Sequence, residues 1–132
     1  MSDTSSGSLL GTEPALRTIA MPADTNPNGD IFGGWLLAQM DLAGSTVAVR
    51  RAKGRVVTVS VTSMTFKRPV FIGDEVTCYA KILKSGRTSI TVRIETWVRR
   101  GRGGDPVAVT EGVFTFVSVD ENRQPRPLPP AD

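Results

Sequence analysis

The fold of this chain is decided by residues 24–51, which read DTNPNGDIFGGWLLAQMDLAGSTVAVRR. A stretch dense in Asn, Asp, Pro and Gly leads into an apolar segment that predicts one long helix. The helix should begin near Gly33 or Gly34, run to about Ala52 and stop at Gly54. Because its apolar residues cover most of the circumference, we expect it to be wrapped on most sides.

One acid interrupts this apolar helix. Asp41 is the only charged residue between Asp30 and Arg50. In a buried helix an ionised carboxylate without partners costs several kcal/mol, so the position calls for an explanation. A catalytic role is one. The other is a structural Asp that is hydrogen-bonded to nearby backbone or to Ser45, one helical turn further on.

Four long segments after the helix alternate apolar and polar residues with the two-residue period of a half-buried β-strand. They span residues 55–66, 75–84, 88–99 and 107–119, and a short apolar segment, 15–21, precedes the turn. Hairpin-length connections predict antiparallel pairing. A helix of about 27 Å against strands of roughly 36 to 43 Å requires a curled sheet. The expected fold is α+β, with a five-stranded antiparallel sheet wrapped around a long central helix.

Length and composition indicate a single domain with loose ends. A chain of 132 residues forms one domain, which we place at residues 15–120. Residues 1–14 are predicted to be a disordered tail and residues 121–132 a Pro-rich tail. The start of the chain lacks signal-peptide features, and no apolar run reaches the roughly 18 residues that span a bilayer. We therefore expect a soluble protein, and the single Cys78 agrees with a reducing cytoplasm.

The composition also excludes several kinds of chemistry. The chain contains no histidine, so it cannot form a Ser-His-Asp or Cys-His catalytic arrangement or a His-ligated metal site by itself. Acid–base chemistry must use carboxylates, Lys, Tyr, Cys or water. The formal charge of +3 is dispersed and aromatic residues are few, which argues against nucleic-acid binding and suits an anionic small ligand.

Five sequence segments carry a resemblance to a known family: NPNGDIFGGWLLAQMD, GRVVTVSV, FKRPVFIGDEV, KSGRTSI and VFTFVSVD. Over residues 15–120 the chain resembles the hot-dog superfamily and, within it, bacterial acyl-CoA thioesterases of the YciA-like kind. The resemblance implies a hot-dog fold, a homodimer that often assembles into a hexameric trimer of dimers, and active sites between protomers. It implies hydrolysis of fatty acyl-CoA, of short to medium or broad chain length, to free CoA and a carboxylic acid without a cofactor or metal.

The resemblance also assigns catalytic residues. It matches Asp41 to the catalytic acid, as general base or as nucleophile through an anhydride, and Asn26 to an Asn supplied by the facing subunit. The backbone N–H groups of Gly33 and Gly34 match the oxyanion donors. Unpaired N–H groups and the dipole at a helix N-terminus favour an anion there. For Asn26 the alternative is a turn-forming Asn before Pro27.

Coenzyme A carries phosphates, so basic residues near the mouth of the site should matter. The candidates are Arg55, the Lys67-Arg68-Pro69 segment and the turn Gly86-Arg87-Thr88-Ser89. In the resembling family, segments like the last two border the nucleotide site. Taken singly, each is more often a solvated turn residue.

Three other functions compete with hydrolysis. A hot-dog dehydratase or hydratase would use a histidine, which this chain lacks. A non-catalytic acyl-CoA sensing or binding module would keep the CoA-binding edge without needing Asp41. A lipid-binding structural oligomer would need neither. Thiol release from CoA esters separates these alternatives from an enzyme.

Overall fold

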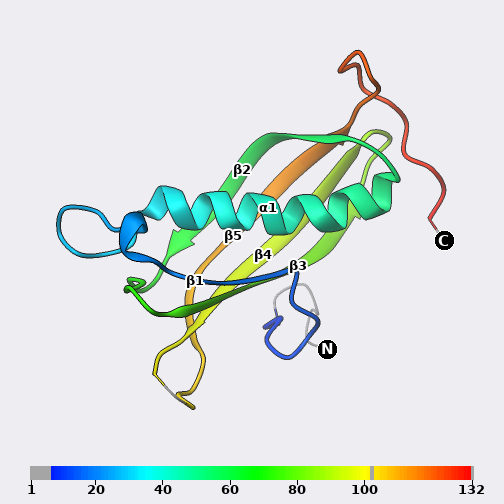
Figure 1. Ribbon diagram of the computed structural model, residues 1–132. Coiled ribbons are helices and arrows are strands. Elements are labelled where there is room, and N and C mark those ends of the chain that lie inside the picture. Colours follow the sequence, from blue (N-terminus) through cyan, green and yellow to red (C-terminus); the bar gives the residue numbers. More distant parts are fainter. Residues whose placement is uncertain (1–6, 102, 132) are drawn as a thin grey trace.

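The computed structural model describes residues 7–101 and 103–131, and consists of one long helix lying across a curved antiparallel sheet (Figure 1). Its elements are β1 (Leu16–Ile19), a 3-10 turn η1 (Pro22–Asp24), α1 (Gly33–Ala52), β2 (Val56–Phe66), β3 (Glu75–Ser85), β4 (Ser89–Arg99) and β5 (Val107–Ser118). The strand order is β1-β3-β4-β5-β2, and every pairing is antiparallel. The predicted α+β, hot-dog architecture with five strands is confirmed. No helix in the described ranges has the length and apolarity to cross a bilayer.

The main core lies where α1 meets the centre of the sheet. Phe114 and Phe116 of β5 stack with their ring centroids 6.3 Å apart, and both are completely buried. Gly44 faces them from the helix. A Cβ atom at Gly44 would lie 2.6 Å from Ile94 Cδ1 and 2.9 Å from Phe116 Cζ. Since real Cβ atoms do not approach so closely, glycine is what allows the helix backbone to reach the sheet.

The helix ends at Ala52, as predicted, but the residue that stops it is not the expected glycine. Lys53, and not Gly54, adopts the left-handed conformation, with φ of 52°. Gly54 lies under Arg126 instead: a Cβ atom there would lie 2.5 Å from Arg126 Nη2, and the guanidinium would have to shift. The glycine therefore makes room for an arginine from the end of the chain.

Only one face of α1 is covered by the sheet, so the prediction of a helix wrapped on most sides is wrong. Leu37, Leu42 and Val49 are 37%, 55% and 44% exposed. Val59 and Val61 of the edge strand β2 are 55% and 39% exposed. A single curved sheet can cover only part of a cylinder. The remaining apolar residues form an open surface along α1 and β2.

Both chain ends are better attached than their composition predicts. Of the predicted N-terminal tail, residues 1–6 lie outside the described residues. Leu9 is buried, and its N–H donates to Glu95 Oε1 at 2.9 Å. At the other end, Leu128 packs against the main core, and its N–H donates to the Arg87 carbonyl at 2.9 Å. Residues 121–131 contain no helix or strand, yet tertiary contacts fix part of them.

The tight packing at Gly44 predicts a specific sensitivity. We expect Gly44→Val to lower the free energy of unfolding by about 2 kcal/mol or more, because the added carbons collide with Ile94 and Phe116. Guanidinium denaturation measures the change. Thr46→Val is the matched control, because Thr46 is exposed on the same helix and should change stability by less than about 0.5 kcal/mol. Equal effects of the two variants would contradict this account of the packing.

Candidate active site

The loop before α1 is held closed by the side chain of Asn26. Asn26 Oδ1 accepts hydrogen bonds from the backbone N–H of Asn28 at 2.9 Å and of Asp30 at 3.1 Å. Gly29, with φ of 90°, supplies the turn between them. These bonds direct the side-chain oxygen into the loop and leave the amide NH2 pointing away from it. The turn-forming role of Asn26 is thus present, and its NH2 group can still serve a ligand.

The first turn of α1 presents backbone donors next to this loop. Gly33 and Gly34 are exposed, and within the described residues their N–H groups have no hydrogen-bond acceptor. The Trp35 N–H donates to the Phe32 carbonyl at 3.1 Å. The helix dipole favours an anion at this position. Two N–H groups therefore remain for an oxyanion.

A cavity of about 340 Å³ joins several of the predicted site residues at this end of the helix. Its walls come from the loop, the first turn of α1 and the segment after β2, and include Asn26, Gly33, Lys67, Arg68 and Pro69. The structure thus brings together two of the predicted catalytic positions and one of the predicted CoA-binding segments. The Phe66 ring also lines the cavity and lies 3.5 Å from the position of a Cβ atom on Gly33.

The two cations of this cavity are anchored to the neighbouring strand. Lys67 Nζ lies 2.5 Å from Glu111 Oε1. The Arg68 Nη1 atom donates to the Ala108 carbonyl at 2.6 Å. Both side chains remain partly exposed, so these contacts orient the positive charges without removing them from solvent.

Asp41 lies elsewhere, about two turns along the helix. Its carboxylate is half-buried, and its Oδ1 atom accepts a hydrogen bond of 2.6 Å from Thr58 Oγ1. Ser45 is not its partner, because Ser45 Oγ donates to the Leu42 carbonyl. The carboxylate is therefore held at the boundary between the covered face and the open surface of α1. It does not line the cavity at the helix N-terminus.

Thr58 is a candidate site residue that the sequence did not reveal, because it hydrogen-bonds to Asp41. In the alternating pattern of β2 it is one of several polar residues on one face. A register irregularity between Thr58 and Ser60 interrupts the pairing with β5. Such bulges re-aim a side chain. The role of Thr58 shows only in the folded chain, where a bulge follows it and the Asp41 carboxylate lies opposite it. Both features depend on the tertiary arrangement of β2, β5 and α1.

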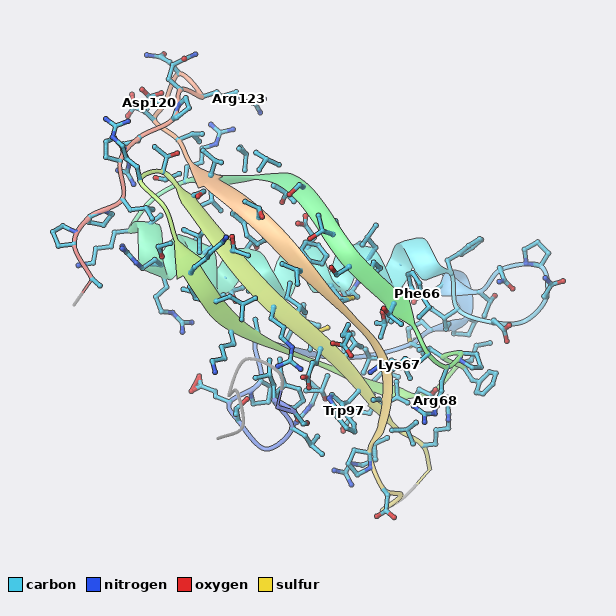
Figure 2. All side chains as sticks on the ribbon, turned by 180° about the vertical axis from the view of Figure 1, so that it is seen from behind. Phe66, Lys67, Arg68, Trp97, Asp120 and Arg123 are labelled. Carbon is cyan, nitrogen blue, oxygen red and sulfur yellow. The ribbon has the colours of Figure 1, made fainter. Side chains whose placement is uncertain are left out.

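The predicted CoA-binding residues divide between the two ends of the sheet. Phe66, Lys67 and Arg68 lie at one end, whereas Asp120 and Arg123 mark the other (Figure 2). Arg55 and the Gly86–Ser89 turn belong to the second end. The Val119 N–H donates to the Arg55 carbonyl at 3.0 Å, and the Ser118 N–H to the Thr88 carbonyl at 2.9 Å. Within one copy of the chain, the two groups of predicted CoA-binding residues therefore lie at opposite ends of the sheet.

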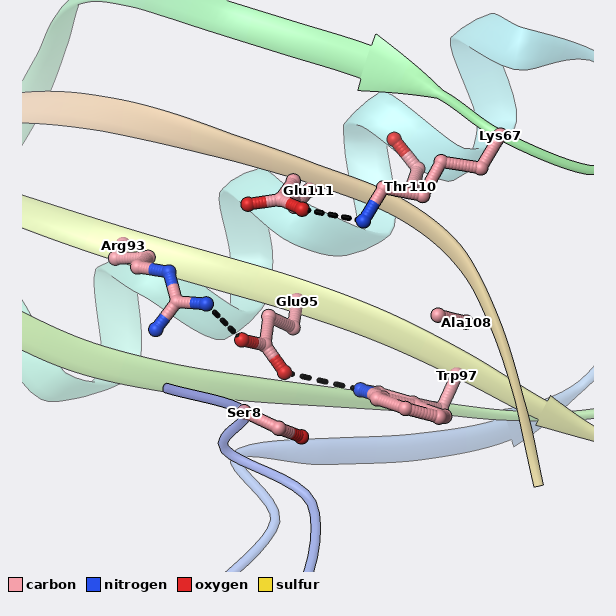
Figure 3. Close-up of a pocket in the computed structure, with 8 residues that line it drawn as sticks. All are labelled: Ser8, Lys67, Arg93, Glu95, Trp97, Ala108, Thr110 and Glu111. Atoms are coloured by element: carbon pink, nitrogen blue, oxygen red, sulfur yellow. Dashed lines mark hydrogen bonds and ion pairs between the residues drawn. The ribbon is translucent and has the colours of Figure 1, made fainter. Parts of the chain in front are cut away.

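A second group of charged residues occupies the sheet face that points away from α1 (Figure 3). Arg93 pairs with Glu95, and Trp97 Nε1 donates to Glu95 Oε1 at 3.0 Å. Arg93 also donates to the Gly7 carbonyl at 2.5 Å. These residues line a cavity of about 210 Å³. Because the charges are paired with one another and with the N-terminal segment, the group serves to attach that segment to the sheet.

Neither a metal nor a cysteine nucleophile fits the described residues. Within residues 7–101 and 103–131, no three His, Cys, Asp or Glu side chains converge as a metal site requires. Burial raises the pKa of the Cys78 thiol to about 11, although a hydrogen bond with Thr96 opposes the shift. A thiol with so high a pKa is a poor nucleophile near neutral pH.

Comparison with known proteins identifies the family of this chain. A family model described as "Thioesterase superfamily" matches residues 28–104, more than half of the chain. This chain belongs to the thioesterase superfamily. The matched range begins in the loop that carries Asn28 and ends after β4, so it includes α1 with Asp41 and the strand with Thr58.

Three relatives of this thioesterase-superfamily chain are informative. It is 52% identical over 132 residues to the acyl-CoA thioester hydrolase YciA of Salmonella typhimurium, covering 98% of this chain and 96% of that protein. The hexameric thioesterase y2039 from Yersinia pestis is 55% identical, with a TM-score of 0.86 over 89% of this chain and 97% of that one. HI0827, a hexameric broad-specificity acyl-CoA thioesterase solved as an aspartate-to-alanine mutant, is 50% identical, with a TM-score of 0.86 over 89% and 86% of the chains.

The burial of Cys78 predicts slow thiol labelling of this thioesterase-superfamily chain. At pH 8 a thiol with a pKa of about 11 is ionised in about one molecule in 1,000, against about one in ten at the ordinary value of 9.0. We expect a chromogenic disulfide reagent to react at least about 100-fold more slowly with the native protein than with protein unfolded in guanidinium. Immediate labelling of the native protein would show that Cys78 is accessible.

Proposed function

We propose that this protein hydrolyses fatty acyl-CoA esters of short to medium or broad chain length to free CoA and a carboxylic acid, with Asp41 as the reacting carboxylate. Acyl-CoA thioester hydrolysis as such follows from 52% identity to YciA over nearly the whole chain. Broad chain length is supported by the description of HI0827 as a broad-specificity enzyme. The observation that carries the assignment of Asp41 is its 2.6 Å hydrogen bond with Thr58 at the edge of the open apolar surface.

The proposed chemistry uses few groups. As general base, Asp41 removes a proton from water while the oxygen adds to the thioester carbonyl carbon. As nucleophile, its carboxylate would add directly and form an anhydride, which water then hydrolyses. In both cases the carbonyl oxygen becomes negative, the C–S bond breaks, and CoA leaves as thiolate and takes up a proton. The Gly33 and Gly34 N–H groups are suited to hold the oxyanion. Thr58 fixes one carboxylate oxygen and leaves the other for the reaction.

We propose that two copies of the chain complete each site. About 12 Å of helix separates Asp41 from the first turn of α1, and the N-terminal cavity does not include Asp41. The open surface along α1 and the edge strand β2 provides an apolar contact for a second copy. A two-fold axis perpendicular to α1 would make the two helices antiparallel, so that Asn26 and the helix N-terminus of one copy would face Asp41 of the other.

The same pairing would unite the two halves of the CoA-binding surface. Lys67, Arg68 and Pro69 of one copy would approach Arg55 and the Gly86–Ser89 turn of its partner. Arginine forks and the backbone N–H groups of a turn are suited to phosphate. A hexamer built as a trimer of dimers is part of the proposal, supported by the hexameric relatives. So is a cytoplasmic location, which a lone buried cysteine suits.

Asp41→Asn tests the catalytic assignment. The amide keeps the size of the side chain but cannot take a proton or form an anhydride, so we expect kcat to fall by about 100-fold or more. Release of CoA thiol from butyryl-CoA measures it. The control Asp105→Asn removes an exposed carboxylate in the β4–β5 loop and should leave kcat unchanged. Near-normal turnover by Asp41→Asn would exclude the assignment, and absence of thiol release by the wild type would favour a binding module.

Subunit complementation tests the composite site. Asn26→Asp keeps the oxygen that closes the loop but removes the NH2 donor, and we expect it to be inactive like Asp41→Asn. Random re-association of the two variants gives dimers in which half are mixed. Each mixed dimer has one intact site, so activity should return to about one quarter of the wild-type value. If each site lies within a single chain, mixing restores nothing.

A further inference from the structure

The C-terminal segment 125–129 crosses the end of the fold where α1 stops. In Figure 1 the orange-to-red tail runs past the end of α1 on the side of the β3–β4 hairpin. Pro125 forms an isolated bridge with Val119, which begins this crossing. The segment therefore lies beside Arg55 and the Gly86–Ser89 turn, the two groups that should meet the CoA phosphates.

Arg126 joins three parts of the structure at this end. Its Nη2 atom donates to the Ala52 carbonyl at 2.8 Å, and its Nε donates to Ser118 Oγ at 3.4 Å. Its backbone N–H donates to the Ser118 carbonyl at 2.8 Å. The half-buried guanidinium passes directly over Gly54, which has no side chain to obstruct it. Arg126 thus fixes the C-terminal segment between the last residue of α1 and the last residue of β5.

Leu128 and its neighbour attach the segment to the hairpin and the helix. The Leu128 N–H donates to the Arg87 carbonyl at 2.9 Å, and its side chain packs against the main core. Arg51 Nη1 donates to the Pro129 carbonyl at 2.6 Å. Because Arg87 lies in an exposed hairpin turn, the bond from Leu128 limits where that turn can lie relative to the core.

The C-terminal segment also balances charge at the C-terminal end of α1. The C-terminus of a helix carries partial negative charge and repels a phosphate. Arg126 offsets that charge by bonding the Ala52 carbonyl, which is one of the last acceptors of α1. Arg126 and Arg55 also line a common cavity of about 350 Å³, which Asp120 and Glu121 line as well. Together with Arg50 and Arg51 in the last turn, Arg126 makes this end of α1 more favourable to an anion.

We propose that Arg126 and Leu128 are positioning residues for the nucleotide of CoA. They hold Arg55 and the Gly86–Ser89 turn in one anion-binding surface and neutralise the end of α1 beneath it. The inference rests on the proposed thioesterase function and extends it, because it makes the C-terminal segment a determinant of affinity for the phosphorylated part of the substrate. The acyl-transfer chemistry at Asp41 does not depend on this segment.

The test compares two substrates that share the thioester and differ in the nucleotide. Butyryl-CoA carries the phosphorylated adenosine, whereas S-butyryl-pantetheine lacks it. For Arg126→Met we expect KM for butyryl-CoA to rise about tenfold with little change in kcat. The value of kcat/KM for S-butyryl-pantetheine should stay at the wild-type level. Arg126→Lys should recover part of the affinity for butyryl-CoA.

Two further variants separate position from charge and from folding. Arg123→Met removes the same charge from an exposed site in the preceding turn and should leave both substrates unaffected. Gly54→Ala keeps Arg126 but places a Cβ atom 2.5 Å from its Nη2 atom, so it should displace the guanidinium and raise KM for butyryl-CoA alone. Gly54→Ala keeps the inference testable if Arg126→Met does not fold.

The outcomes are distinct. A loss confined to butyryl-CoA in Arg126→Met or Gly54→Ala supports the positioning role. An equal loss of kcat/KM on both substrates would mean that the segment has only a structural role and would contradict the inference. An unchanged KM for butyryl-CoA in both variants would also overturn it. If wild-type protein hydrolyses neither substrate, it is the proposed function that fails.

Discussion

The close approach of α1 to the sheet at Gly44 is the constraint on which the rest of the structure depends. With no side chain at this position, the helix backbone comes within reach of Ile94 and Phe116 and shares one dry core with them. Because α1 packs so closely on the sheet, one face of the helix is buried against it. The opposite face, with Leu42 and Val49, is left without cover in a single copy. Asp41 lies at the boundary between the two faces, where a carboxylate can be fixed by Thr58 without being fully buried.

The same helix organises charge along its length. Its N-terminus offers the unpaired N–H groups of Gly33 and Gly34 to a developing anion, and its C-terminus would repel the anionic part of the substrate. Arg126 reduces this repulsion by donating a hydrogen bond to the Ala52 carbonyl. In the proposed dimer the two helices run in opposite directions, so that the favourable end of one copy meets the neutralised end of the other. A single element would then serve both the reacting thioester and the distant phosphates.

Several parts of the molecule could be predicted because their signals are local. The period of the strands, the start of α1 at Gly33 and the loop around Asn26 follow from neighbouring residues. Other features depend on partners that are distant in the chain. Thr58 meets Asp41 only when β2 lies beside α1, and the Leu9 N–H meets Glu95 only when the N-terminal segment lies on the sheet. Neither pairing leaves a periodic trace in the sequence.

The sequence by itself determined the class of fold, the extent of the long helix and the candidate residues at its first turn, because short-range sterics and hydrophobic periodicity act between near neighbours. It also determined that no histidine takes part. Only the tertiary structure decided which face of α1 is left open, which side chain holds Asp41, and that Gly54 accommodates Arg126. These depend on the distance between segments that meet only after folding, and steric exclusion and hydrogen bonding act only at contact.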